Sequence, residues 1–313
     1  MNLIFMGTPD FAVPALNALI ESRHNLCAVV TQPDKPVGRK RIITPPPVKK
    51  IALEKGIPIF QPENVKSEAF IHQLRELKPD LILVAAFGQI LPKAVLEIPR
   101  IGCLNVHASL LPAYRGAAPI QWAIINGEDK TGVTIMWMNE GMDTGDIFFQ
   151  EALSIDENWT SEDLFRELAA LGGKMTALAL DRIEAGDILR VPQDNRKATY
   201  APMLKKADCK IDWSKSNRQV HNLIRGMNPW PGAYTFRNGR EIKIWKSRIY
   251  GEGKTGTYPG VFLGVVKNIG FLVGTGEGCI IIEELQEEGK KRLNAIDYLA
   301  GHRLVEGDKF SDE

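Results

Sequence analysis

The sequence predicts an α/β part followed by a smaller all-β part, on three observations. Over the first 189 residues, short apolar runs alternate with amphipathic helical patterns, as in βαβ units with a mostly parallel sheet. After a polar, proline-containing segment, the patterns become those of strands alone. The length of 313 residues exceeds that of one ordinary domain, so each part is long enough to bury its own core. We therefore expect two domains.

Residues 1–189 are expected to form a Rossmann-like open sheet with helices on both faces. The expected strands are LIFMG, LCAVVTQ, IPIFQ, LILVAAF and CLNVHAS, and helical patterns lie at FAVPALNALIESR, VKKIALEKG, SEAFIHQLRELK and APIQWAIING. LILVAAF is apolar on both faces, which predicts a central strand. TGVTIMWM and DIFFQEALSI predict a hairpin at the end of the sheet. A helix from about Ser161 to Ala185 follows, with Gly186 as its stop.

The second part begins after a predicted linker, residues 190–205, where RVPQDNRKATYAPML is polar and punctuated by proline. In residues 206–313 one helical pattern, SNRQVHNLIRGM, precedes a series of strands. Asn238-Gly239 lies between two strand patterns and is a strong hairpin signal. Further strands are expected at GVFLGVV, GFLVGTG and GCIIIEEL. These patterns favour an OB-like β-barrel over an extension of the first sheet.

Composition and cysteine spacing exclude several classes of protein. With 44% hydrophobic and 25% charged residues, the composition is that of an ordinary globular protein. No cationic start leads into an apolar run, and no window holds about 18 uninterrupted apolar residues, so we expect a cytoplasmic protein without membrane spans. The four cysteines are scattered without a C-x-x-C spacing, so neither disulfides nor a zinc site are expected.

The net charge of +1 conceals an uneven distribution along the chain. Residues 31–50 hold six basic side chains and one acidic one, and residues 206–253 hold ten basic and four acidic ones. Residues 101–188, which lie between these two segments, hold five basic and fourteen acidic side chains. This pattern suggests that two basic regions meet a polyanion, although solvated surface alone also explains charge runs.

Two polar residues in an apolar strand pattern, Asn105 and His107, indicate a site. Side chains alternate along a strand, so both lie on the same side. In an open parallel sheet, sites form at the carboxyl ends of the strands, where GTPDF, FGQILP, HASLLPAYRG and NEGMDTG are expected to meet. GTPDF lacks the G-x-G-x-x-G spacing, so a dinucleotide cofactor is not supported.

Asn105, His107 and Asp143 together would suit acyl transfer. Asn and protonated His can stabilise an oxyanion and supply a proton to a departing amine, and Asp143 would orient the imidazole and favour its charged form. None of the three is a strong nucleophile, and no G-x-S-x-G motif is present, so direct transfer is expected. A capping or core-edge role for Asn105 and His107, and a turn role for Asp143, remain the alternatives from spacing alone.

Longer motifs resemble the folate-dependent formyltransferases: NVHASLLPAYRGAAPIQWAI, FMGTPDFA near the start and GVTIMWMNEGMDTGDI. The resemblance implies that Asn105, His107 and Asp143 are the catalytic residues and that 10-formyltetrahydrofolate donates the formyl group through a tetrahedral intermediate. It implies no metal and no other cofactor. It also implies folate contacts from Ser109, Leu110, Leu111, Pro112, Gln89, Ile90, Leu91, Glu140 and Gly141. For the side chains of Leu110 and Leu111, core packing is the alternative.

Three further motifs, TQPDKPVGRKR, PPPVK and NPWPGAY, resemble the member of this family that formylates methionine esterified to initiator tRNA. The resemblance spans essentially the whole chain. Basic residues in loop 33–48 would neutralise phosphates or contact bases of the acceptor stem, and basic residues of the barrel would hold the tRNA electrostatically. The expected tRNA contacts are Arg39, Lys40, Arg41, Lys206, Lys210, Lys243 and Lys246.

Two details qualify these expectations. Ala113 stands where relatives often have a basic residue in LLP-x-YRG, which leaves Arg115 as the candidate for a basic contact there. Trp213, Trp230, Tyr234 and Trp245 lie among the basic residues of the barrel, and core packing is favoured for most of them over stacking on bases. We expect a monomer. A formyltransferase for a sugar nucleotide or purine precursor, and a non-catalytic RNA-binding protein, are the alternative functions.

Overall fold

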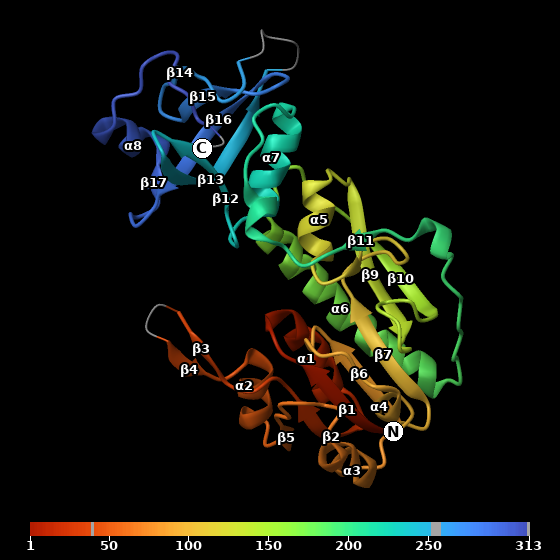
Figure 1. The fold of residues 1–313 in the computed structure, drawn as a ribbon. Coiled ribbons are helices and arrows are strands. Elements are labelled where there is room, and N and C mark those ends of the chain that lie inside the picture. Colours follow the sequence, from red (N-terminus) through yellow and green to blue (C-terminus); the bar gives the residue numbers. More distant parts are fainter. Residues whose placement is uncertain (39–40, 252–257, 312–313) are drawn as a thin grey trace. The chain divides into compact units, whose positions relative to one another are not determined.

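The computed structural model describes residues 1–38, 41–251 and 258–311 (Figure 1). The contacts between residues divide the chain into two compact units. The first comprises Met1–Pro119, Lys130–Ser154 and Phe165–Ala201, and the second comprises Ile120–Asp129, Ile155–Leu164 and Pro202–Glu313. Two short segments that precede residue 190 in the chain therefore belong to the second unit.

The first unit is built on a seven-stranded sheet in the order β10-β9-β7-β6-β1-β2-β5. Its strands are β1 (Asn2–Gly7), β2 (Asn25–Val30), β5 (Ile59–Phe60), β6 (Leu81–Ala85), β7 (Gly102–His107), β9 (Lys130–Trp137) and β10 (Ile147–Ser154). The first five are parallel, whereas β9 is antiparallel to both β7 and β10. All five residues of β6 are buried, as its apolar pattern predicted. The predicted mostly parallel sheet with a terminal hairpin is confirmed.

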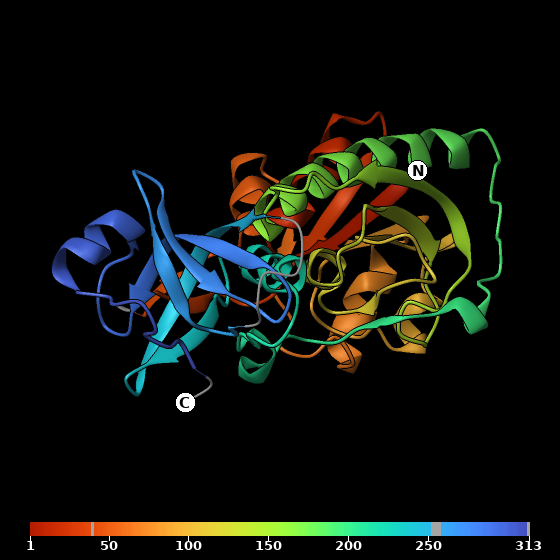
Figure 2. The same ribbon diagram turned by 90° about the horizontal axis from the view of Figure 1, so that it is seen from above.

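Helices cover both faces of this sheet. They are α1 (Val13–Glu21), α2 (Pro47–Glu54), α3 (Glu68–Glu76), α4 (Lys93–Leu96) and α6 (Ser161–Glu184), and Gly186 follows α6 with a positive φ. Side chains of α3 and α4 share a core with Ile4, Met6 and Ile82 on one face. On the other face α6 lies along the sheet (Figure 2, green) and approaches α1 so closely that a Cβ on Gly173 would stand 2.8 Å from Pro14.

The basic segment 33–48 contains an antiparallel hairpin, which the sequence pattern did not predict. Its strands are β3 (Lys35–Val37) and β4 (Ile42–Thr44). Arg39 and Lys40 lie outside the described residues. Arg41 is exposed with φ 49°, and Ile42 and Ile43 are 62% and 69% exposed.

The second unit contains an antiparallel sheet in the order β12-β13-β16-β15-β14, with β17 paired to β16. Its strands are β12 (Ala233–Arg237), β13 (Arg240–Tyr250), β14 (Phe262–Val266), β15 (Gly270–Gly274), β16 (Cys279–Glu287) and β17 (Leu293–Asn294). Residues 309–311 pair with Phe236 on one edge strand and with Val261 beside the other, which closes the sheet as a barrel requires. The predicted separate antiparallel domain is confirmed.

Local signals explain several elements of the second unit. Helix α7 (Asn217–Gly226) begins with a capping box between Ser216 and Gln219. Asn238 and Gly239 have φ of 52° and 71°, as a two-residue hairpin turn between β12 and β13 requires. The unit also contains α5 (Pro119–Ile125) from its Ile120 onward, and α8 (Ala295–Gly301). No helix within the described residues is long and apolar enough to cross a membrane.

Much of segment 190–205 is tied to the first unit. Strand β11 (Tyr200–Ala201) pairs in parallel with β8 (Arg115–Gly116), which follows the SLLP turn. The Tyr114 amide donates to the Thr199 hydroxyl at 2.8 Å, and the Arg115 amide donates to the Thr199 carbonyl at 2.9 Å. This segment therefore contributes to the surroundings of the predicted site.

Candidate functional site

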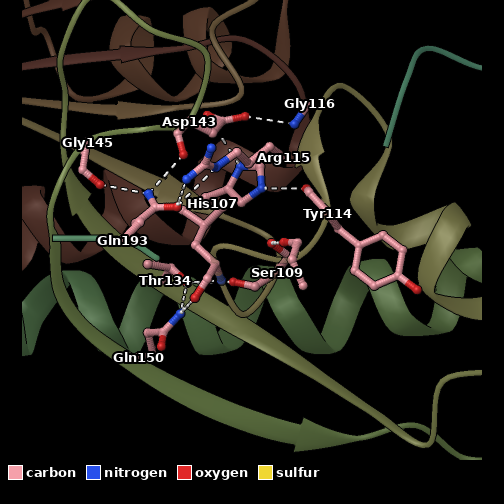
Figure 3. A network of polar contacts seen from close by, with 12 residues as sticks. His107, Ser109, Tyr114, Arg115, Gly116, Thr134, Asp143, Gly145, Gln150 and Gln193 are labelled. Carbon is pink, nitrogen blue, oxygen red and sulfur yellow. Dashed lines mark hydrogen bonds and ion pairs between the residues drawn. The ribbon is translucent and has the colours of Figure 1, made fainter. Parts of the chain in front are cut away.

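His107 ends β7 and is only 6% exposed. Its Nε2 lies 3.0 Å from the Tyr114 carbonyl oxygen, and because a carbonyl only accepts, Nε2 carries the proton and donates. Its Nδ1 faces Asp143, 3.7 Å from Oδ1 (Figure 3). That distance permits an ion pair with a protonated ring but is too long for a hydrogen bond. The imidazole therefore contacts two different loops, one through each nitrogen.

Asp143 lies in the loop between β9 and β10, half-buried and with φ 52°. Its Oδ2 accepts a hydrogen bond of 2.8 Å from the Gly116 amide. Left-handed backbone is uncommon for residues other than Gly, and Asp is among those that tolerate it best. The carboxylate is thus directed toward His107 by the backbone of the loop and by Gly116.

Asn105 precedes His107 by two residues on β7 and is half-buried. It pairs in register with Val84 of β6 and Met136 of β9. Strand alternation places its side chain on the same side of the sheet as that of His107. Its catalytic role stays a prediction.

The backbone of the SLLP segment is held in place by hydrogen bonds to side chains of this segment and of two other strands. The Ser109 hydroxyl, fully buried, donates to the Ala113 carbonyl at 2.6 Å. The Thr134 hydroxyl donates to the Ser109 carbonyl at 2.6 Å and accepts from the Leu111 amide at 3.1 Å. Gln150 Nε2 donates to the Leu111 carbonyl at 2.8 Å. No sequence motif indicated Thr134 and Gln150, because they belong to β9 and β10.

The other predicted folate residues differ in exposure. Leu91 and Leu111 are each 3% exposed, so their side chains pack in the core, whereas Ile90 is 71% exposed. Gln89 joins the loop after β6 to the preceding segment through the Val65 amide at 3.2 Å and the Pro62 carbonyl at 3.3 Å. Leu110 and Pro112 are half-buried.

Glu140 and Gly141 line a cavity of about 490 Å³ in the first unit. Trp137, Met138 and Arg190 also line it, and the Arg190 guanidinium lies 4.0 Å from the centre of the Trp137 ring. Cys103 borders the same cavity, but burial raises the pKa of its thiol to about 12, so it is no nucleophile. In the described part of the chain, no group of three or more His, Cys, Asp and Glu residues could hold a metal ion.

Arg115 is only 2% exposed, which corrects its assignment as a candidate basic contact. Its Nε and Nη2 donate to Gln193 Oε1 at 3.1 and 2.6 Å, and Nη2 also donates to Asn195 Oδ1 at 2.8 Å (Figure 3). The sequence motif placed the residue correctly in the loop, but its partners lie in segment 190–205, too far along the chain for spacing to reveal them.

Three of the four barrel lysines predicted to contact tRNA already have partners. Lys206 pairs with Glu241 at 2.9 Å, which raises the pKa of the lysine, and Lys246 pairs with Glu283 at 3.0 Å. Lys243 donates to the Pro231 carbonyl at 2.8 Å. Lys210 is half-buried, next to Ile211, whose amide donates to the Tyr234 carbonyl.

The aromatics of the second unit are mostly buried, as core packing requires. Trp213 and Tyr234 are 4% and 8% exposed, and Trp245 is half-buried. Trp230 differs, with 65% of its surface exposed. Core packing is therefore confirmed for Trp213 and Tyr234, and Trp230 is the exception.

Comparison with protein families covers both units. The model described as "Formyl transferase" matches residues 1–180, and that described as "Formyl transferase, C-terminal domain" matches residues 203–303. Among curated relatives, the methionyl-tRNA formyltransferase of Geobacter metallireducens is 52% identical and covers 98% of this chain and 97% of its own length. That of Acetivibrio thermocellus is 47% identical, covering 98% and 99%. That of Geotalea daltonii is 50% identical, covering 99% and 98%.

Solved structures share the fold at lower identity. WlaRD, a sugar 3N-formyl transferase crystallised in the presence of dTDP and 5-N-formyl-THF, has a TM-score of 0.68 at 22% identity, covering 93% of this chain and 99% of its own. HypX from Aquifex aeolicus in complex with tetrahydrofolic acid has a TM-score of 0.64 at 19% identity, covering 99% of this chain and 50% of its own.

Proposed function

The chain belongs to the formyl transferase family, and we propose that it transfers a formyl group to the amino group of methionine carried by tRNA. The observation that carries this proposal is the identity of 52%, 47% and 50% to three methionyl-tRNA formyltransferases over nearly the whole chain. The match extends through the second unit and the basic segment 33–48, which a small amine substrate would not need. The initiator methionyl-tRNA is the proposed acceptor.

The proposed reaction is a direct transfer at Asn105, His107 and Asp143. The neutral methionine amine attacks the formyl carbon, a new C–N bond forms, and the carbonyl oxygen becomes an oxyanion that Asn105 and His107 stabilise. Collapse of this tetrahedral intermediate breaks the bond to the folate nitrogen, which gains a proton as it leaves while the attacking nitrogen loses one. The Asp143 carboxylate, 3.7 Å from Nδ1, supports the positive charge of the protonated imidazole.

A folate is the proposed formyl donor, and 10-formyltetrahydrofolate is the specific form. WlaRD and HypX, which share the fold, were crystallised with folates. We propose the contacts named from the family motif, with the backbone rather than the buried side chains of Leu91 and Leu111 facing the ligand. A flat pterin fits a narrow apolar slot that offers a few backbone polar groups.

The basic segment 33–48 and the barrel are proposed to bind the tRNA. We propose that residues 1–189 carry out catalysis, that residues 206–313 bind tRNA, and that residues 190–205 join the two. We also propose that the protein is a monomer and acts in the cytoplasm. Because Lys206 and Lys246 are ion-paired, tRNA binding there would exchange one anionic partner for another. Arg39, Lys40 and Arg41 are accordingly expected to contribute more to affinity.

The activity is tested with the purified protein and 10-formyltetrahydrofolate. Charged initiator methionyl-tRNA should become formylated, and a dTDP-linked amino sugar should not. Formylation of the sugar alone would identify a sugar N-formyltransferase. Folate binding without transfer to either acceptor would identify a binding protein.

The tRNA contact is tested by replacing Arg39, Lys40 and Arg41 together by Ala. If the three neutralise two or three phosphates, each adds roughly −0.7 to −0.9 to the slope of log affinity against log salt, so the slope should flatten by about 2 units. Turnover of a minimal aminoacyl substrate without the acceptor stem should not change. The matched control replaces three exposed cations elsewhere, Lys55, Lys66 and Arg75, and an equal flattening there would refute a specific contact.

A further inference from the structure

We propose that Gln193, fixed by Arg115, is a positioning residue that holds the Asp143 loop in the geometry required for formyl transfer. This inference deepens the proposed function and rests on it. Gln193 Nε2 donates to the Asp143 carbonyl at 2.9 Å and to the Gly145 carbonyl at 2.7 Å. One amide group therefore binds the backbone of the loop at the predicted catalytic carboxylate and two residues beyond it (Figure 3).

The orientation of the Gln193 amide follows from its partners. Arg115 only donates, so the amide atom that faces it must be the oxygen, with contacts of 3.1 and 2.6 Å. Two carbonyls only accept, so the atom that faces Asp143 and Gly145 must be the nitrogen, and its two hydrogens match the two carbonyls. Reversal of the amide would break all of these contacts. Arg115 thus selects the one orientation that binds the loop.

The loop depends on such support. Asp143 has φ 52°, and Gly145 approaches β9 so closely that a Cβ there would stand 1.8 Å from the Trp137 carbonyl oxygen. Such a backbone persists only where surrounding contacts fix it. Here the fixing contacts come from Gln193 on the backbone and from the Gly116 amide on the carboxylate.

Three consecutive residues join the parts of the predicted site. The Tyr114 carbonyl accepts from His107 Nε2, Arg115 binds Gln193, and the Gly116 amide binds the Asp143 carboxylate. Pairing of Arg115 and Gly116 with β11 ties this segment to the same chain segment that supplies Gln193. A displacement of Gln193 therefore reaches the Asp143 loop while leaving the contact between His107 and Tyr114 in place.

The main test replaces Gln193 by Ala and by Glu. Misplacement of a reacting group by about 1 Å costs roughly a hundredfold in rate, so both variants should lose about 30- to 100-fold in kcat, with KM for folate and tRNA within about threefold. The Glu variant keeps an acceptor for Arg115 but cannot donate to the two carbonyls when ionised. Normal kcat in either folded variant would overturn the proposal.

A double-mutant comparison separates positioning of Asp143 from a general effect on the fold. Once Asp143→Ala has removed the carboxylate, adding Gln193→Ala should lower kcat by less than about threefold. A full 30-fold further loss in the double variant would show that Gln193 acts by another route and would overturn the proposal. Near-normal kcat in Asp143→Ala would refute the catalytic assignment itself, and with it the role of Gln193.

A measurement without substrate distinguishes this inference from the proposed function. In Gln193→Ala, hydrogen exchange of residues 139–146 should quicken at least about tenfold, whichever acceptor the enzyme formylates. The matched control is Gln286→Ala, because Gln286 also accepts at Oε1, from Trp245 at 3.0 Å, and donates through Nε2 to a carbonyl, that of Lys290 at 2.8 Å. The control should leave both the exchange of residues 139–146 and kcat unchanged. Unchanged exchange of these residues in Gln193→Ala would overturn the inference even if the proposed activity stands.

Discussion

Two enclosed histidines, one in each unit, have surroundings of opposite charge. His107 in the first unit is 6% exposed and faces the Asp143 carboxylate, 3.7 Å from Nδ1. His221 in the second unit lies on α7, and its Nδ1 is 3.0 Å from the Ser247 hydroxyl. Burial first, and then the positive charge of Arg225, lower the pKa of His221 from its usual 6.5 to about 4.

The difference shows that burial and the charge of the neighbouring groups together decide what a histidine can do. His107 has an anionic neighbour, whereas burial first, and then the positive charge of Arg225, keep the ring of His221 neutral near pH 7. Arg225 is only 7% exposed, and its guanidinium donates to Asn222 Oδ1 at 2.9 Å and to the Trp159 carbonyl at 3.0 Å. It therefore has a structural role. We therefore assign catalysis to His107 as a proposal, and expect His221 to act on stability alone.

The largest expected effect separates the two histidines by turnover. His107→Ala, like Asn105→Ala and Asp143→Ala, should lower kcat by at least about a hundredfold, since loss of an oxyanion donor or proton donor typically costs that much. His221→Gln should change kcat by less than about threefold. Saturating folate and methionyl-tRNA make kcat the quantity compared. Near-normal turnover in His107→Ala would remove that histidine from the mechanism.

A second expectation concerns stability against pH. The pKa of His221 is lower in the folded state, so the unfolded chain binds this proton at a higher pH than the folded protein does. The free energy of unfolding therefore decreases as the pH falls from about 6.5 to about 4. Between pH 7 and pH 5 this one group should cost about 2 kcal/mol. Gln at position 221 does not titrate. Urea unfolding at the two pH values should therefore show that the free energy of unfolding of His221→Gln decreases by about 2 kcal/mol less than that of the unchanged protein. Equal losses in both proteins would contradict the neutral assignment.

The smallest effect is expected from the partner of His221. Ser247, 7% exposed, provides the hydroxyl next to Nδ1, and Ser247→Ala leaves that nitrogen without it. Loss of one such hydrogen bond should destabilise the protein by about 1 kcal/mol at pH 7, with kcat unchanged. Ser214→Ala, at an exposed hydroxyl bonded to Asp212, is the control and should cost less than about 0.5 kcal/mol. A similar loss of stability in Ser247→Ala and Ser214→Ala would contradict the expectation that a buried hydroxyl contributes more than an exposed one.

The parts of the fold that the sequence predicted well depend on local signals. Ser216 and Gln219 form a capping box within one turn of α7, and Asn238-Gly239 adopts the positive φ angles of a tight hairpin. The buried run of β6 and the hairpin of β9 and β10 follow from hydrophobic patterns within a few residues. Such signals need no knowledge of distant chain segments, which is why they suffice.

Features that depend on distant contacts were not predictable. Gln193 stands in a polar, proline-containing stretch that indicated only a linker, and its partners Arg115 and Asp143 are far from it in sequence. Arg115 looked like a surface cation because nothing local shows that it is buried. The strands β3 and β4 in the basic segment were likewise missed, since Ile42 and Ile43 next to a run of cations gave no alternation of apolar and polar residues.

Closure of the second-unit sheet by residues 309–311 has a consequence for the order of folding. The Ser311 amide donates to the Phe236 carbonyl at 2.8 Å, and the Phe236 amide donates back at 3.1 Å, across a long stretch of chain. Loop-closure entropy must be overcome before such distant segments gain from meeting, so this pairing is expected to form after the hairpin of β12 and β13. In a pulse-labelling experiment during refolding, the Phe236 and Ser311 amides should accordingly become protected later than those of the hairpin.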